Sequence, residues 1–194
     1  MENSGAFTGS VLVNWELNEL NARGSCSLLS WKIKAMNRKD KEAFHVLLAD
    51  DCESDRLLIK MAMRHVARLR LSGEASDGDG VLNYFLGREH FSDRAAFPVP
   101  DLLLLDLKMP GRDGFAVLDW LKSRPYRDLT VVVLTDSMEP EHIKRALDLG
   151  ADLYQVKPRT NDDRLNMLVA LESHLVKICS PPQYSRLPLT ARTA

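Results

Sequence analysis

Short apolar runs that end in polar side chains constrain the fold of this chain more than any other feature. The three clearest runs cover residues 45–49, 101–105 and 130–134. Their apolar residues do not alternate with polar ones, as they would in a strand with one face in water. Runs that are apolar on both faces are typical of strands in a parallel sheet covered by helices on both sides. Two weaker strands are predicted near residues 69–76 and 153–156.

Between these runs the apolar residues recur at helical spacing. Either Ser54 or Asp55 is a candidate N-cap for the first of these helices. Strand and helix then alternate five times, which predicts a single α/β domain with parallel strands and right-handed connections. The apolar positions expected to face the core in the successive helices are Leu57, Leu58, Met61 and His65, then Val81, Leu82 and Phe85, then Phe115, Leu118 and Leu121, then Ile143, Ala146 and Leu147, and finally Leu165, Leu168, Leu171 and Leu175.

The two flanks lack this alternation. Residues 1–43 contain one short amphipathic stretch, and we expect an N-terminal extension that is either flexible or not native. Residues 44–178 form the predicted domain. Residues 179–194 contain three prolines and no periodicity, so a disordered C-terminal tail is expected there.

Composition narrows the class of protein but does not identify it. A formal net charge of −1 gives no reason to expect nucleic-acid or membrane binding. The three cysteines (Cys26, Cys52 and Cys179) are odd in number and lack metal-ligand spacing, which favours a reducing compartment. No apolar stretch approaches the roughly 18 residues of a membrane span, and the N-terminus does not resemble a secretory signal. We therefore expect a cytoplasmic protein.

Five chemically capable side chains follow the predicted strands. Asp50 and Asp51 end the first strand, Asp106 the third, Thr135 the fourth and Lys157 the fifth. Because the carboxyl ends of parallel strands meet at one edge of a sheet, these side chains are expected to gather there. Three neighbouring carboxylates repel one another unless a cation is present. A hard divalent ion with oxygen ligands is suited to such a cluster, and Mg2+ is the expected ion.

Such a set of groups is complete for phosphoryl transfer. One carboxylate attacks phosphorus and becomes an acyl phosphate, while the cation and an ammonium neutralise charge on the phosphoryl oxygens. A hydroxyl donates a hydrogen bond to another of those oxygens. Phosphoryl transfer depends mostly on positioning and electrostatic stabilisation of this kind.

Four motifs, in this order, resemble the receiver domains of two-component response regulators. They are the acidic pair Asp50-Asp51, residues 104–111 with Asp113-Gly114, Leu134-Thr135, and residues 154–158. The resemblance runs from about residue 44 to 178. It implies a flavodoxin-like, five-stranded parallel sheet of strand order 2-1-3-4-5 with helices on both faces. The long segment of residues 87–100 further resembles single-domain regulators associated with bacterial phytochromes.

The resemblance also implies a role for each residue. Asp106 is the phosphoacceptor, and Lys157 and Thr135 contact the phosphoryl group. Asp51 and Asp106 bind Mg2+ directly together with the backbone carbonyl of Lys108, whereas Asp50 acts largely through water. The donor is a phosphohistidine on a sensor histidine kinase or a histidine phosphotransfer protein. Apart from its own phosphorylation and dephosphorylation, such a domain is not an enzyme.

Two interpretations of Tyr154 are open: it is a core residue, or it is a switch that turns inward when Thr135 shifts toward the phosphoryl group. If it is a switch, the surface that contains Tyr154 is expected to bind the partner. The signal is then passed on by protein contact, and a homodimer through that surface is one possibility. Asp136 departs from the family pattern, which has a small residue after the threonine. This departure leaves the rate of phosphorylation open.

Two other classes of protein share parts of this pattern. Haloacid-dehalogenase-like phosphohydrolases combine the same residue types, but their nucleophile comes first in the chain and their acidic pair late. Here the acidic pair is early and Asp106 is followed by Leu107-Lys108, which disfavours a phosphohydrolase. A phosphorylation-independent interaction module is the second alternative, and it predicts no Mg2+-dependent labelling by acetyl phosphate.

Overall fold

Strands and helices alternate along the described part of the chain. The structure, a computed structural model, describes residues 41–124, 126 and 128–178. Residues 1–40 of the predicted N-terminal extension (residues 1–43) and the predicted tail (residues 179–194) lie outside this part of the chain. The elements in chain order are β1 (Phe44–Ala49), α3 (Glu53–Met63), β2 (Leu69–Ala75), α4 (Gly78–Leu86), the short 3-10 helix η1 (Glu89–Phe91), β3 (Leu102–Leu105), α5 (Gly114–Lys122), β4 (Thr130–Thr135), α6 (Pro140–Asp148), β5 (Leu153–Val156) and α7 (Asn161–Ile178).

All five strands are parallel and form one sheet of order β2-β1-β3-β4-β5. This order confirms the flavodoxin-like fold expected from the sequence. Ala49 of β1, Leu105 of β3 and Val133 of β4 lie side by side in the sheet register. The residues that follow these three therefore emerge at the same edge.

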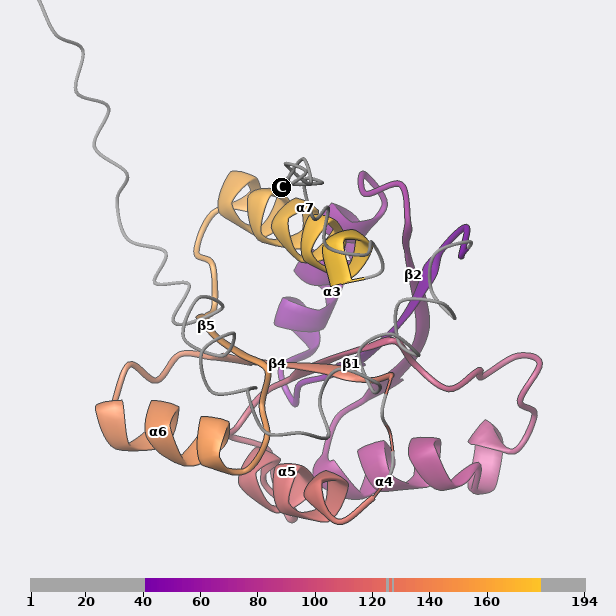
Figure 1. Ribbon diagram of the computed structural model, residues 1–194, viewed down its shortest axis with the longest axis vertical. Coiled ribbons are helices and arrows are strands. Elements are labelled where there is room, and N and C mark those ends of the chain that lie inside the picture. The colour runs from indigo at the N-terminus through magenta and orange to yellow at the C-terminus, as the bar shows by residue number, and fades with distance from the viewer. Residues whose placement is uncertain (1–40, 125, 127, 179–194) are drawn as a thin grey trace, which may run out of the picture.

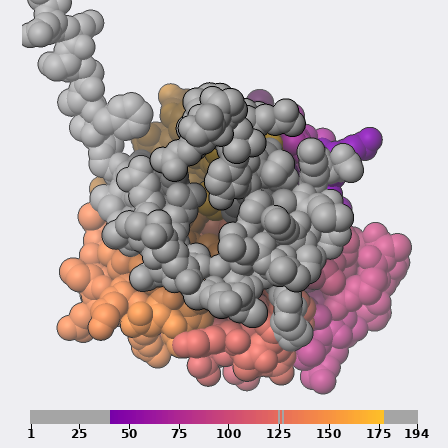
Figure 2. Space-filling view, viewed as in Figure 1, coloured from indigo at the N-terminus to yellow at the C-terminus, as the bar shows by residue number. Residues whose placement is uncertain are grey.

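Helices cover both faces of the sheet, with α3 and α7 on one face and α4, α5 and α6 on the other (Figure 1). In Figure 2 the atoms of α6, α5 and α4 lie in a row along one border of the molecule, in keeping with their mutual contacts. Alternate residues of each strand enter opposite cores. Leu103 and Leu105 pack beneath α4 and α5, whereas Leu102 and Leu104 pack against the α3 and α7 side. A strand buried on both faces has no polar positions, which explains the uninterrupted apolar runs.

The predicted apolar face of α3 is wrong. Leu57 and Met61 are 52% and 50% exposed, and His65 is also exposed. Nearly every residue from 57 to 63 is apolar, so periodicity could not select a face, and packing of α3 on the sheet and on α7 selects it instead. The residues that α3 buries are Ile59, Ala62 and Met63.

The long segment before β3 folds back on α4. The Arg94 guanidinium donates hydrogen bonds of 2.8 Å to the carbonyls of Tyr84 and Phe85 at the end of that helix. The buried Tyr84 hydroxyl donates to the carbonyl of Pro98 at 2.8 Å, and its ring packs edge-to-face on Phe91. Residues 87–100 therefore form a packed extension of the α4 side of the domain.

No helix within the described residues is long and apolar enough to cross a membrane.

Candidate functional site

The carboxyl edge of the sheet brings the five predicted site residues together. The amide of Asp106 continues the sheet by donating to the carbonyl of Ala49 at 2.8 Å. At the other side of the site, the amide of Lys157 donates to the carbonyl of Thr135 at 2.9 Å. Backbone pairing thus fixes the starting point of each functional side chain. The site is built by the ends of β1, β3, β4 and β5.

The Lys157 ammonium lies at the centre of the site. Its Nζ is 2.8 Å from Oδ2 of Asp50 and 2.8 Å from Oδ2 of Asp106. A third carboxylate, that of Asp55, accepts from the same nitrogen at 3.0 Å. The side chains of Asp50 and Asp106 are 3% and 6% exposed, so their charges are removed from solvent. Buried charges need partners, and one ammonium serves three carboxylates here.

The pKa values of the site reflect this crowding. Burial acts to lower the pKa of the Lys157 ammonium, but its hydrogen bonds to Asp106, Asp50 and Asp55 outweigh burial and raise that pKa above its ordinary value. Burial raises the pKa of Asp50, and the attraction of Lys157 only partly offsets it. Lys157 is therefore charged at neutral pH, and the ionised form of Asp50 is costly.

Oxygen atoms of Asp50, Asp51 and Asp106 lie within 4.8 Å of one another. Asp51 is exposed and the other two are buried, so the cluster opens to solvent on one side. Backbone amides orient the buried pair: Cys52 donates to Oδ1 of Asp50 at 2.9 Å, and Lys108 to Oδ1 of Asp106 at 3.2 Å. Three carboxylates with a single lysine leave excess negative charge. The donor set fits a hard divalent cation that keeps several waters, such as Mg2+.

Thr135 is fully buried, and none of the described residues gives its Oγ1 a hydrogen-bond partner. An unpaired buried hydroxyl is costly, and such groups occur at functional sites. Thr135 ends β4 beside Lys157. Asp136, which departs from the family pattern, is exposed to solvent.

Tyr154 is 2% exposed, and its hydroxyl donates to the carbonyl of Ser137 at 3.0 Å. Burial raises the pKa of this hydroxyl, which therefore stays protonated. The Ser137 hydroxyl in turn lies 2.8 Å from Nδ1 of His142 on α6. Tyr154 thus ties β5 to the segment that follows Thr135. Its role as a switch stays a prediction.

Asp55, predicted from the sequence only as a candidate helix cap, is also a site residue. Cys52 occupies the N-cap of α3 instead, without a side-chain hydrogen bond, and Asp55 lies in the first turn. The signal was present in the sequence: α3 begins two residues after Asp51, so its first turn has to lie at the same edge of the sheet. What the spacing could not show is that Asp55 points toward Lys157.

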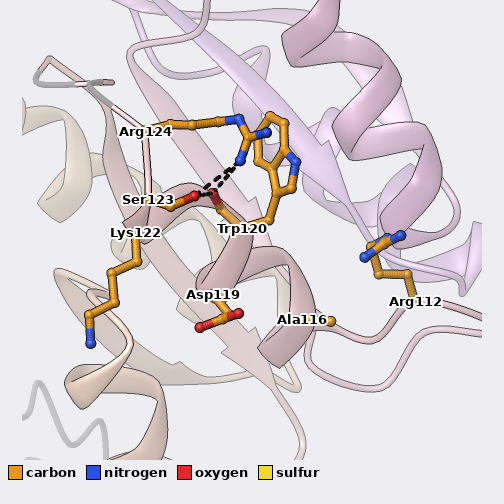
Figure 3. A pocket seen from close by; sticks show the side chains of 7 residues that line it. All are labelled: Arg112, Ala116, Asp119, Trp120, Lys122, Ser123 and Arg124. Carbon is orange, nitrogen blue, oxygen red and sulfur yellow. Dashed lines mark hydrogen bonds between the residues drawn. The ribbon is translucent and has the colours of Figure 1, made fainter.

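An open hollow of about 430 Å3 lies along α5, away from the carboxylate cluster (Figure 3). The Arg124 guanidinium stacks over the Trp120 ring at 3.7 Å. Arg112 and Lys122 lie at opposite ends of the hollow and do not converge on a common point (Figure 3). Because a binding site needs convergent polar groups, the candidate site is the carboxylate cluster and not this hollow.

The sheet order and the acidic edge with its central lysine define the class of α/β signalling domains that accept a phosphoryl group on an aspartate. The chain belongs to the response regulator receiver domain family, whose model matches residues 46–169.

Similar proteins include full-length matches and longer regulators. Response regulator Rcp1 of Synechocystis is 26% identical over 138 residues, which cover 71% of this chain and 92% of Rcp1. The chain spans only 51% to 55% of the length of several other curated regulators that it matches.

Three solved structures are similar over nearly their whole length. The Mn2+-bound form of Rcp1 has a TM-score of 0.59 at 26% identity, covering 72% of this chain and 99% of that one. The phosphorylated cyanobacterial phytochrome response regulator RcpA has a TM-score of 0.61 at 26% identity, with the same two coverages. Response regulator RPA3017, in red light signalling of R. palustris, has a TM-score of 0.62 at 33% identity and covers 71% and 97%.

Proposed function

We propose that this chain is a single-domain response regulator whose Asp106 accepts a phosphoryl group from a histidine kinase or a histidine phosphotransfer protein. The observation that carries the proposal is the Lys157 ammonium, which lies 2.8 Å from the buried Asp106 carboxylate at the cation cluster. A carboxylate oxygen forms a bond to phosphorus as the phosphorus–nitrogen bond of the donor breaks. The electron pair of that bond stays on the departing imidazole nitrogen.

The chain's own residues then hold the transferred group. Lys157 is charged and already at hydrogen-bond distance from Asp106, so it can neutralise a phosphoryl oxygen without moving far. The Thr135 hydroxyl, for which the described part of the chain offers no acceptor, is the second donor, and a phosphoryl oxygen is its proposed acceptor. These are the roles of Lys157 and Thr135 in the proposal.

The acidic cluster is the proposed Mg2+ site. Asp51 and Asp106 bind the ion with the backbone carbonyl of Lys108, and Asp50 contributes largely through water. A bound cation supplies charge neutralisation on the phosphoryl oxygens. The Mn2+-bound state of the similar regulator Rcp1 supports a divalent ion at such a site. Oxygen ligands and an open side favour Mg2+.

Output by protein contact follows from the same proposal. Phosphorylation replaces the single charge of the Asp106 carboxylate with roughly two charges on the phosphoryl group, at a site whose lysine and threonine are near β4 and β5. A shift of Thr135 would also displace Ser137, two residues later, and so change its hydrogen bond with the Tyr154 hydroxyl. We place the partner surface, including a homodimer contact, on the face of α6, β5 and α7. A cytoplasmic location, no direct nucleic-acid or membrane binding, and no activity besides self-phosphorylation and dephosphorylation complete the proposal.

The upstream kinase is proposed to belong to a phytochrome-type system. Of the similar structures, RcpA is a cyanobacterial phytochrome response regulator and RPA3017 is a response regulator in red light signalling. Both are matched over almost their full length, unlike the longer regulators. The packed segment of residues 87–100 is the feature of this chain that suggested the subgroup.

The test is labelling by acetyl phosphate with and without Mg2+, in the wild type and in Asp106→Asn. We expect Mg2+-dependent incorporation of one phosphoryl group in the wild type and none in the variant. Equal incorporation in both proteins would exclude Asp106 as the acceptor. Absence of labelling in both would favour the phosphorylation-independent module, and rapid release of phosphate from small esters would favour the phosphohydrolase.

A further inference from the structure

The Lys157 ammonium contacts three carboxylates: it donates hydrogen bonds to Asp106 and Asp55 and forms an ion pair with Asp50. Asp50 and Asp106 belong to the cation cluster, but the third carboxylate, that of Asp55, does not. Asp55 comes from the first turn of α3 and is 102 residues away from Lys157 in the chain. The contact therefore joins the start of the first described helix to the end of the last strand of the sheet.

The three carboxylates are not equivalent once the site is in use. A cation bound by Asp106, and by Asp50 through water, competes with Lys157 for their oxygens, and phosphorylation removes the carboxylate charge of Asp106. Asp55 is free of both demands, so its contact with Lys157 can persist through the reaction. We propose that Asp55 is a positioning residue that keeps the Lys157 ammonium beside the phosphoacceptor. This inference rests on the function proposed above for Asp106 and Lys157.

The surroundings of Asp55 fit an anchor more than a mobile surface acid. Arg56, the next residue, donates to the carbonyl of Asp50 at 2.6 Å and pairs with Glu74 at 3.3 Å, which fixes the first turn of α3. The space beside Lys157 and Asp55 is only about 10 Å3. It has room for no more than a single water. The Lys157 side chain is 11% exposed and that of Asp55 is 31% exposed, so Asp55 lies on the solvent side of a nearly buried ammonium.

Asp55 has two separable effects on the site. Its oxygen accepts a hydrogen bond and holds the ammonium, and its negative charge repels an anionic phosphoryl donor. Asp55→Asn keeps a carbonyl acceptor and removes the charge, whereas Asp55→Ala removes both. Positioning therefore predicts that alanine is the more damaging change and that asparagine retains most of the function. Electrostatic repulsion alone predicts that both variants react faster than the wild type.

The first experiment measures the rate of phosphorylation against acetyl phosphate concentration at saturating Mg2+. We expect Asp55→Ala to lower the maximal rate constant roughly tenfold, the scale of one charge-assisted hydrogen bond. Asp55→Asn should lie between alanine and wild type, and the Mg2+ affinity from calorimetry should be unchanged in both. Glu53→Ala is the matched control, because it removes an exposed carboxylate from the same helical turn. It should behave as wild type.

The second experiment observes the Lys157 ammonium directly by NMR in protein without added metal. Exchange of its hydrogens with water should be faster in Asp55→Ala than in the wild type or in Glu53→Ala. A maximal rate in Asp55→Ala equal to that of wild type, or a parallel loss of Mg2+ affinity, would overturn the proposal. If the wild type takes up no phosphoryl group, the proposed function fails. Even in that case, an unchanged exchange rate of the Lys157 ammonium hydrogens in Asp55→Ala would by itself overturn the proposal that Asp55 positions Lys157.

Discussion

The buried charge of Asp50 is costly, so we predict that the stability difference between Asp50→Asn and wild type has opposite signs without and with Mg2+. Asp50 is 2% exposed, and burial raises its pKa despite the nearby Lys157. At 4.8 Å and an effective dielectric constant of roughly 20, repulsion between two carboxylates of the cluster amounts to about 3.5 kcal/mol. Asp50→Asn removes one of these charges and leaves Lys157 with two carboxylates. Without Mg2+ the variant should therefore be more stable than wild type, by about 1 to 2 kcal/mol.

Mg2+ should reverse that order. A ligand at about 100 times its dissociation constant stabilises the folded state by roughly 2.7 kcal/mol. This gain is expected in wild type and is largely lost in Asp50→Asn, so wild type becomes the more stable protein. The assay is thermal unfolding with and without Mg2+, in which 1 kcal/mol corresponds to about 3 °C in Tm. The control is Asp51→Asn: its charge is exposed, so it should lose the response to Mg2+ without gaining stability beforehand.

The pH dependence has a defined sign. A carboxyl group whose pKa is raised by folding stabilises the protein when protonated, and this contribution is lost as the pH rises through the folded-state pKa. The advantage of Asp50→Asn should thus be full at neutral pH and shrink toward zero as the pH approaches the ordinary value of 3.8. The reasoning is refuted if Asp50→Asn is no more stable than wild type without Mg2+, or if Mg2+ raises the Tm of both proteins equally.

Three further substitutions test other parts of the site. Gly114→Ala would place a Cβ 2.3 Å from the carbonyl oxygen of Asp106, so both labelling by acetyl phosphate and the Tm should fall. Gly111 has φ +69° but no neighbour within 4 Å of an added Cβ, so Gly111→Ala should cost only about 1 kcal/mol and keep labelling. Similar labelling of the Gly114→Ala and Gly111→Ala variants would contradict this expectation. Thr135→Val removes a hydroxyl that none of the described residues binds, so the Tm of the unphosphorylated protein should not fall. The increase in Tm caused by beryllofluoride, an analogue of the phosphoryl group, should be smaller than in wild type. A lower Tm of the unphosphorylated variant would show that the hydroxyl has a partner. Tyr154→Phe leaves a buried carbonyl unpaired and should cost about 1 kcal/mol in denaturant unfolding, and no loss would argue against the inward hydroxyl contact.

The sheet and the central site residues were predictable because they depend on short-range rules. The part of a strand that is buried on both faces is mostly apolar, so residues 102–105 and 131–134 are recognisable without any tertiary information. Parallel strands end at one edge, so Asp106, Thr135 and Lys157 could be brought together before any coordinates were known. These inferences require the order of the elements and no side-chain orientation.

The errors concern the orientation of α3. Its sequence is apolar at too many positions for the period to choose a face, and the exposure of Leu57 and Met61 depends on contacts with the sheet and α7. The orientation of α3 that exposes Leu57 and Met61 also points Asp55 toward Lys157, and no local sequence pattern encodes this orientation. Sequence reasoning failed where a helix with several acceptable faces is fixed by partners distant in the chain.

The residues that fit this fold worst are those on which the proposed function depends. Asp50 is ionised at a position where burial disfavours its charge, and Thr135 buries a hydroxyl that none of the described residues binds. The buried hydroxyls of Tyr84 and Tyr154, in contrast, both donate to backbone carbonyls. A cation would relieve the first defect and a phosphoryl oxygen the second. Both defects lie beside Lys157, so cation binding and phosphorylation together would supply the missing partners and stabilise the site. The modified and unmodified states would then differ in free energy, as a two-state switch requires.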